Sequence, residues 1–154
     1  MSFKKNDQEL VRSIILDHYE NPQNFINENK INKLKNYVSC NISSPSCIDN
    51  LTAHVDIKNN IICDIKISGI GCAISTSSTD IMCNLLIGKS ISNARKIITN
   101  YLNMIDNKPY DESILDELFC FANVNKQANR INCAKVGIKA IENALEKYEN
   151  SKRK

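Results

Sequence analysis

A run of alternating apolar and polar residues in the first half of the chain constrains the fold most. Apolar residues occupy every second position over residues 51–58, and the alternation resumes over residues 61–68. A period of two is that of a strand with one buried face. Between the two runs stand Asn59 and Asn60, which tolerate the positive φ angles of a tight turn. The pattern predicts an antiparallel hairpin, and an apolar segment at 37–42 predicts one more strand, which comes first in the chain.

Helical periodicity dominates the remainder of the chain. An amphipathic segment at 6–19 ends at Asn21-Pro22, because the residue before proline disfavours the helical region, and the polar residues 23–35 predict a loop. After Gly71, apolar residues recur at helical spacing, and the predicted helices cover residues 73–86, 91–105, about 111–121 and about 133–148. Three strands followed by segregated helices predict an α+β domain, with a small three-stranded antiparallel sheet packed against helices.

Length and charge indicate one domain without a nucleic-acid or membrane partner. Residues 1–154 suffice for one hydrophobic core, and a flexible C-terminal tail is expected from about residue 150. The net charge is only +3, and no apolar run approaches the ~20 residues of a membrane span. No apolar signal segment precedes the first predicted helix, so a cytoplasmic location is expected. Disulfides rarely persist there, which favours metal binding or thiol chemistry for some of the seven cysteines.

Three cysteine segments, far apart in the chain, suggest a site. Cys47 and Asp49 stand two residues apart in the loop between the first two predicted strands, where their side chains can converge. Cys72 stands where the third strand gives way to a helix, and Cys133 is expected to open the last helix. Three thiolates and one carboxylate suffice to close a tetrahedral zinc site. From spacing alone, a metal centre and a reactive-thiol site both remain open.

The expected helix starts would favour the reactive form of two of these thiols. A thiol at a helix N-terminus is stabilised as the thiolate, which is the form that binds metal and attacks sulfur, and Arg130 would add to this effect. The alternative for any single cysteine is a small buried hydrophobe. That interpretation is preferred for the remaining cysteines, which are Cys40, Cys63, Cys83 and Cys120. Neither histidine stands at a ligand position: His18 is expected to bond to a turn, and His54 to lie on the solvent-facing side of its strand.

Four motifs occur in one order along residues 10–148. They are Asp17-His18-Tyr19-Glu20-Asn21-Pro22-Gln23-Asn24, Cys47-x-Asp49, Gly69-x-Gly71-Cys72-x-Ile74-Ser75 and Arg130-x-x-Cys133-Ala134. Together they resemble the SufU/IscU (NifU N-terminal) family of iron–sulfur cluster assembly proteins. The resemblance implies that family's α+β fold with a three-stranded antiparallel sheet. It also implies that zinc or an iron–sulfur cluster is bound by Cys47, Asp49, Cys72 and Cys133.

Differences between the branches of this family favour SufU. IscU-type scaffolds carry a histidine immediately before the third cysteine, where this chain has Asn132, and a Leu-Pro-Pro-Val-Lys motif that is not seen here. The longer gap before the third cysteine, filled by residues 109–124, and the presence of Arg130 are similar to SufU. The resemblance then implies a zinc-dependent sulfur carrier rather than a conventional turnover enzyme. It would accept a persulfide from a SufS-type cysteine desulfurase and supply downstream iron–sulfur scaffold proteins.

The same resemblance implies a role for each residue. A histidine of the desulfurase would take over one zinc position, freeing Cys47 to accept sulfur, while Arg130 supports the site or the partner contact. The metal would be held by Asp49, Cys72 and Cys133. The family normally has glycine where this chain has Ile48, a β-branched residue that a positive φ would strain. Two alternatives remain: a scaffold on which the cluster itself is built, and a domain with a purely structural zinc.

Overall fold

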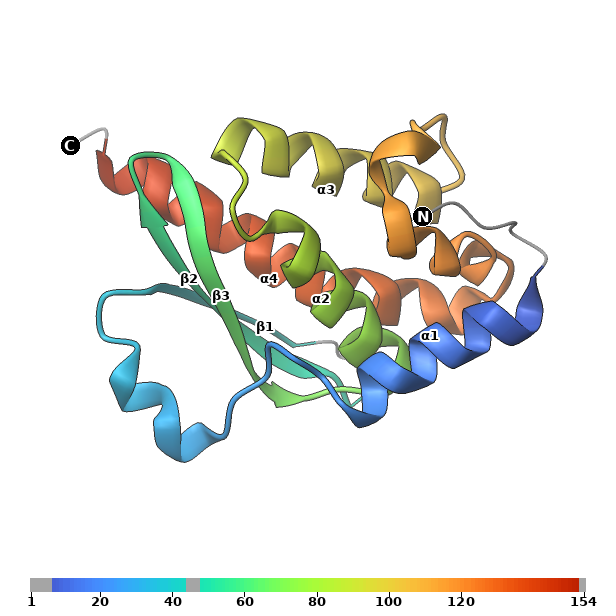
Figure 1. Cartoon of the computed structure of the whole chain (residues 1–154), viewed down its shortest axis with the longest axis horizontal. Helices are drawn as coiled ribbons and strands as arrows, with labels where there is room; N and C mark the ends of the chain where they lie inside the picture. The colour runs from blue at the N-terminus through green and yellow to red at the C-terminus, as the bar shows by residue number, and fades with distance from the viewer. Residues whose placement is uncertain (1–6, 44–47, 153–154) are drawn as a thin grey trace.

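The computed structural model describes residues 7–43 and 48–152 and confirms the predicted α+β class (Figure 1). The sheet has the order β1-β2-β3 and is antiparallel throughout; its strands are β1 (Val38–Ser43), β2 (Asn50–Lys58) and β3 (Ile61–Ile70). The α-helices are α1 (Gln8–Glu20), α2 (Ala73–Leu86), α3 (Ile91–Ile105) and α4 (Ala128–Lys152). None of the described helices combines the length and apolar character of a membrane span.

The hairpin forms as predicted, but a β-bulge changes which residues it buries. Asn59 and Asn60 have φ angles of 54° and 63°, as the tight turn requires. The register shifts between Asp56 and Ile57, so that one extra residue of β3 is accommodated at Cys63. Ile62 is therefore fully buried, whereas Ile61 and Cys63 are exposed. The expected buried positions of Ile61 and Cys63 were wrong, because alternation in a sequence does not reveal a bulge.

The core lies between the sheet and the helices. Leu51, Ala53 and Val55 of β2 are fully buried, as the alternation predicted. Helix α4 lies along β1 and β2 and also contacts α2 (Figure 1). The contact with α2 is very close at Gly137, where a Cβ atom would lie 1.7 Å from Thr79 Oγ1. These two helices supply residues of the candidate site, so their packing sets its geometry.

The other face of the sheet is partly covered. Residues 24–26 pair with the edge of β3 through hydrogen bonds to Ile67, and the 3₁₀ helix η1 (Glu28–Lys33) follows them, where a loop was expected. His54 is buried, with its ring bonded to Ser39 Oγ at 2.6 Å and Ser68 Oγ at 2.9 Å. The prediction of a solvent-facing His54 was wrong, because hydroxyl groups on both neighbouring strands satisfy its ring.

Two helix predictions also need correction. The expected helix at about 111–121 is a series of 3₁₀ turns, η2 (Glu112–Ile114) and η3 (Asp116–Phe121), and a further turn, η4 (Val124–Lys126), precedes α4. Asp116 has a φ of 47°, which interrupts a regular α-helix. Helix α4 begins at Ala128, before Cys133. The sequence did not reveal this start, because the first turn is exposed and shows no apolar stripe. It continues to Lys152, so residues 150–152 are helical.

Candidate metal centre

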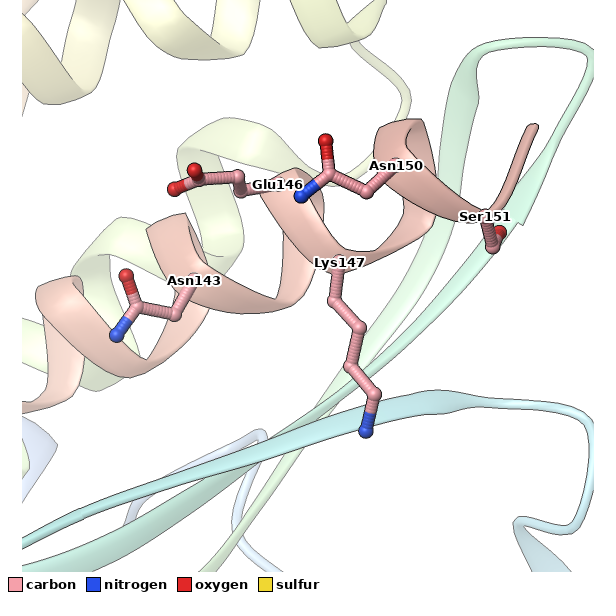
Figure 2. Close-up of a pocket in the computed structure, with 5 residues that line it drawn as sticks. All are labelled: Asn143, Glu146, Lys147, Asn150 and Ser151. Atoms are coloured by element: carbon pink, nitrogen blue, oxygen red, sulfur yellow. The ribbon is translucent and has the colours of Figure 1, made fainter. Parts of the chain in front are cut away.

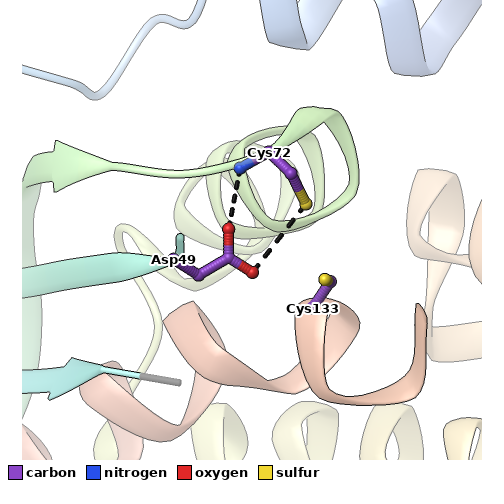
Figure 3. A group of neighbouring side chains, drawn as sticks. All are labelled: Asp49, Cys72 and Cys133. Atoms are coloured by element: carbon purple, nitrogen blue, oxygen red, sulfur yellow. Dashed lines mark hydrogen bonds between the residues drawn. The ribbon is translucent and has the colours of Figure 1, made fainter. Parts of the chain in front are cut away.

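Three of the four predicted ligands meet beside one end of the sheet (Figure 3). Asp49 stands immediately before β2, Cys72 at the start of α2, and Cys133 in α4. One ligand atom from each, a carboxylate oxygen or a sulfur, lies within 4.8 Å of the others. These residues could therefore hold one metal ion between them. The fourth predicted ligand, Cys47, lies outside the described residues.

The carboxylate of Asp49 is buried and oriented. Its residue is only 1% exposed. Oδ1 accepts a hydrogen bond from the backbone N–H of Cys72 at 2.8 Å and another from the hydroxyl of Ser75 at 2.9 Å. Oδ2 lies 3.8 Å from Cys72 Sγ (Figure 3). A buried carboxylate needs such donors, and here they engage one oxygen while the other faces the thiol.

Cys72 is the N-cap of α2, as predicted. Its backbone is extended, with φ −72° and ψ 178°, and its Sγ accepts a hydrogen bond from the Ser75 backbone N–H at 3.5 Å. The end of β3 leads into this cap through Gly69, which has a φ of +115°. A Cβ atom at Gly69 would lie 2.1 Å from the Asn50 carbonyl oxygen. Glycine therefore allows β3 to pass close to β2 and bring Cys72 beside Asp49.

Cys133 reaches the site from the side of a helix. It lies in the second turn of α4 and is 5% exposed, so the prediction that it opens the last helix was wrong. Its Sγ is 4.0 Å from the carbonyl oxygen of Asn129, one turn earlier. Cys72 therefore lies beside the free N–H groups at the start of α2, whereas Cys133 lies beyond the corresponding groups at the start of α4. Arg130 lies exposed in the first turn of α4, and its role stays a prediction.

The cysteines outside the motifs differ in exposure. Cys83 is fully buried and Cys120 nearly so, and both belong to the hydrophobic core. Burial raises the pKa of the Cys83 thiol well above its usual range and that of Cys120 to about 12. Both thiols are therefore neutral packing groups, as predicted for them. Cys40 is half-buried against the core, whereas Cys63 is exposed at the bulge.

Sequence reasoning missed the role of His18. Its Nδ1 lies 2.7 Å from Oδ2 of Asp80, a fully buried carboxylate in α2, and its Nε2 lies 3.4 Å from Glu117 Oε1. The other oxygen of Asp80 accepts the backbone N–H groups of Gln23 and Asn24, each at 2.9 Å. The motif at 17–24 therefore fastens α1 and the following segment to α2. The one signal in the sequence was Asp80, the one charged residue in the predicted helix at 73–86.

A hollow outside the candidate metal centre lies along the C-terminal half of α4 (Figure 2). It is lined by Asn143, Glu146, Lys147, Asn150 and Ser151. Lys147 extends away from the helix, and its Nζ donates a hydrogen bond to the Ser39 carbonyl oxygen at 3.1 Å. At 1.5 Å per residue, the hollow begins about 15 Å along the helix from Cys133. These polar groups of one helix are not part of the candidate metal centre.

The fold and the donor set together define an α+β domain that can bind a metal through thiols and a carboxylate. Residues 11–154 match the model of the NifU-like N terminal domain, and the chain belongs to this family.

Two curated relatives cover most of the chain. The chain is 33% identical over 150 residues to the zinc-dependent sulfurtransferase SufU of Bacillus subtilis (strain 168), covering 97% of this chain and 98% of that protein. It is 26% identical over 143 residues to the iron–sulfur cluster assembly scaffold protein IscU of Streptococcus pyogenes serotype M1, covering 92% and 86%.

Solved structures agree with the fold. A SufU structure from Fervidobacterium islandicum AW-1, described as an iron–sulfur cluster assembly scaffold protein for the SUF system, superposes with a TM-score of 0.75 at 30% identity. The superposition covers 86% of this chain and 93% of the Fervidobacterium chain. A NifU-like N-terminal protein from Brucella abortus has a TM-score of 0.76 at 17% identity, covering 89% and 92%, and supports the fold alone.

Proposed function

We propose that this protein is a zinc-dependent sulfur carrier of iron–sulfur cluster assembly. It accepts sulfur on Cys47 from a SufS-type cysteine desulfurase and delivers that sulfur to downstream scaffold proteins. The observation that carries the proposal is the convergence of Asp49, Cys72 and Cys133 on one point. This convergence occurs in a chain similar over nearly its whole length to a zinc-dependent sulfurtransferase.

The donor set fits zinc. Two cysteine sulfurs and one carboxylate oxygen are ligands that zinc accepts in tetrahedral sites. Cys47 is proposed as the fourth ligand, because a residue two positions before Asp49 cannot lie more than about 7 Å from it along the backbone. When bound, zinc would keep the thiols deprotonated at neutral pH without taking part in redox chemistry.

The burial of two of the proposed ligands supports Cys47, rather than Cys133, as the thiol that reacts. Asp49 and Cys133 are 1% and 5% exposed, so a partner cannot reach them without rearranging the domain. Ile48, which adjoins Cys47 in the chain, is 71% exposed. Asp49 and Cys133 are suited to retaining a metal, whereas Ile48, the chain neighbour of Cys47, is accessible to a docking protein. Arg130, exposed one turn before Cys133, is proposed to support the same contact.

The sulfur transfer conserves electrons. The Cys47 thiolate attacks the terminal sulfur of the desulfurase persulfide, and a new S–S bond forms on Cys47. The S–S bond within the desulfurase breaks, and its cysteine leaves as a thiolate. The transferred sulfur keeps its proton or charge, so no external oxidant or reductant is needed.

The scaffold role is the second candidate, because the chain is also similar to IscU over most of its length. It would use the same residues to hold a cluster. In that case the protein purified without oxygen would carry an oxygen-labile visible chromophore and would not stimulate the desulfurase. A purely structural zinc predicts instead that Cys47→Ala unfolds the domain.

The test combines metal analysis of protein purified with and without oxygen with turnover of a SufS-type desulfurase. We expect about one zinc per chain, stimulated turnover, and one added sulfur on the peptide containing Cys47. The Cys47→Ala variant should lose both the stimulation and the added sulfur while remaining folded. Cys63→Ala is the matched control, because it removes an exposed thiol outside the candidate site. Full stimulation by Cys47→Ala would refute the proposal.

A further inference from the structure

The hydroxyl of Ser75 donates a hydrogen bond to the carboxylate of Asp49. We infer that Ser75 is a positioning residue, which fixes the orientation in which the Asp49 carboxylate faces the Cys72 thiol. The inference deepens the proposed zinc site and rests on it. It concerns a serine in the first turn of α2 that is not itself one of the proposed ligands.

The hydrogen bonds of Ser75 show where its proton goes. The residue is fully buried, and its Oγ lies 2.9 Å from Asp49 Oδ1 and 3.2 Å from the Cys72 carbonyl oxygen. A hydroxyl has one proton to donate, and the carboxylate oxygen is the closer of the two acceptors, so the carboxylate accepts the hydrogen bond. The Cys72 backbone N–H donates to the same Oδ1 at 2.8 Å.

Two donors on one oxygen give the carboxylate a preferred orientation. Oδ1 is held by the start of α2, and Oδ2 faces Cys72 Sγ. Turning the carboxylate away from this orientation would lengthen both hydrogen bonds to Oδ1. Ser75 therefore reduces the freedom that Asp49 would lose on binding a metal through Oδ2, which is the usual contribution of groups that hold a ligand in place.

Gly71 gives independent evidence that space is reserved for this hydroxyl. A Cβ atom at Gly71 would lie 2.4 Å from Ser75 Oγ and 3.0 Å from Thr76 Oγ1. Gly71 is not among the positive-φ glycines, so its backbone conformation does not itself demand glycine. The requirement is for space, and the first atom that a side chain would displace is the hydroxyl oxygen bonded to Asp49.

The test compares two serine variants of the full chain. Zinc affinity is measured by competition with a chromophoric chelator, and the site geometry by the visible spectrum of the cobalt-substituted protein. Ser75→Ala should weaken zinc binding about 10- to 100-fold and alter the cobalt spectrum. The matched control is Ser77→Ala, because the Ser77 hydroxyl is equally buried but donates to the Ala73 carbonyl oxygen at 2.6 Å. This control should change neither measurement.

Gly71→Ala provides a second route to the same result. Its new methyl group should displace the Ser75 hydroxyl and weaken zinc binding in the wild-type background. The same substitution should reduce zinc affinity much less in a Ser75→Ala background, where the displaced oxygen is absent. Should Ser75→Ala fail to fold, judged by circular dichroism, Gly71→Ala decides alone, and undiminished zinc affinity in that variant would overturn the inference.

The failures of the two proposals can be told apart. Wild-type protein that binds no zinc would contradict the proposed function itself. Wild-type protein that binds zinc, with Ser75→Ala within a factor of about two of Ser77→Ala, would overturn only the positioning role.

Discussion

At the residue scale, buried polar side chains are held by specific donors and acceptors. Asp80 is fully buried and receives hydrogen bonds from the motif at 17–24, which attaches α1 to α2. Asp49 is held by the start of α2, and His54 by hydroxyl groups on both neighbouring strands. A buried polar group without such partners would cost about 1–3 kcal/mol. These residues therefore specify how the elements are joined, beyond what apolar packing would do.

His54 should make stability depend on pH. Burial lowers its pKa below the ordinary value of 6.5, while the charge of Glu28 acts in the opposite direction. Below about pH 6.5 the unfolded chain binds a proton that the folded protein resists, so stability is lost as the pH falls toward the lowered pKa. His54→Gln can keep bonds to the serines but cannot be protonated. Urea unfolding between about pH 8 and pH 5.5 should show a smaller loss for His54→Gln than for wild type, and equal losses would refute the assignment.

At the element scale, the close contact between α2 and α4 positions the site. Cys72 caps α2 and Cys133 lies in α4, so the separation of these helices decides whether the two sulfurs meet. The contact at Gly137 leaves no space for a side chain, because Thr79 of α2 fills it. Glycine in the middle of a helix is unfavourable by about 1 kcal/mol relative to alanine. Close packing is the physical reason for glycine here.

Gly137→Ala should therefore destabilise the protein despite its better helix propensity. Overpacking costs about 1–3 kcal/mol, and the gain in propensity offsets about 1 kcal/mol of it. Zinc affinity should fall as well, because the helices must move apart. Glu146→Ala, at an exposed position of the same helix, is the control for urea unfolding and zinc titration. Thr79→Ala should restore part of the loss, since it removes two of the atoms that the new methyl group meets; a stabilised Gly137→Ala protein would contradict this account.

At the scale of the whole molecule, the proposed ligands come from three separate parts of the chain. The apolar core runs between the sheet and the helices and includes residues of β2, β3, α2, α3 and α4. Asp49, Cys72 and Cys133 are not members of this cluster of packed side chains. A metal would instead add a link between the residues before β2, α2 and α4. Binding to the folded state alone stabilises a protein by about 4 kcal/mol at a free concentration 1,000 times the dissociation constant.

Removing zinc should therefore lower the melting temperature without unfolding the domain at room temperature. We expect the chelator-treated protein to keep its circular dichroism spectrum and to recover its melting temperature on titration with zinc. The recovery should be absent in Cys72→Ser, which has lost one of the proposed ligands. Loss of the native spectrum on zinc removal would instead support a structural role for the metal.

Periodicity and turn chemistry allowed much of the fold to be predicted. Alternation around Asn59 and Asn60 gave the hairpin, and the change from a period of two to a helical period at Gly71 located the start of α2. Both are local signals, because each depends on neighbouring residues in the chain. The motifs likewise picked out Asp49, Cys72 and Cys133, which the structure brings together.

Features that depend on contacts between distant segments could not be read in this way. The bulge at Cys63 depends on the partner strand, the burial of His54 on serines of two other strands, and the role of His18 on Asp80 of another helix. The start of α4 was missed because an exposed first turn has no apolar stripe. The sequence by itself determined the three strands, the helices α1, α2 and α3, and three residues able to bind a metal. The tertiary structure decided how the Asp49 carboxylate is oriented toward the Cys72 thiol, because that orientation depends on hydrogen bonds and space created only when β2, β3 and α2 come together.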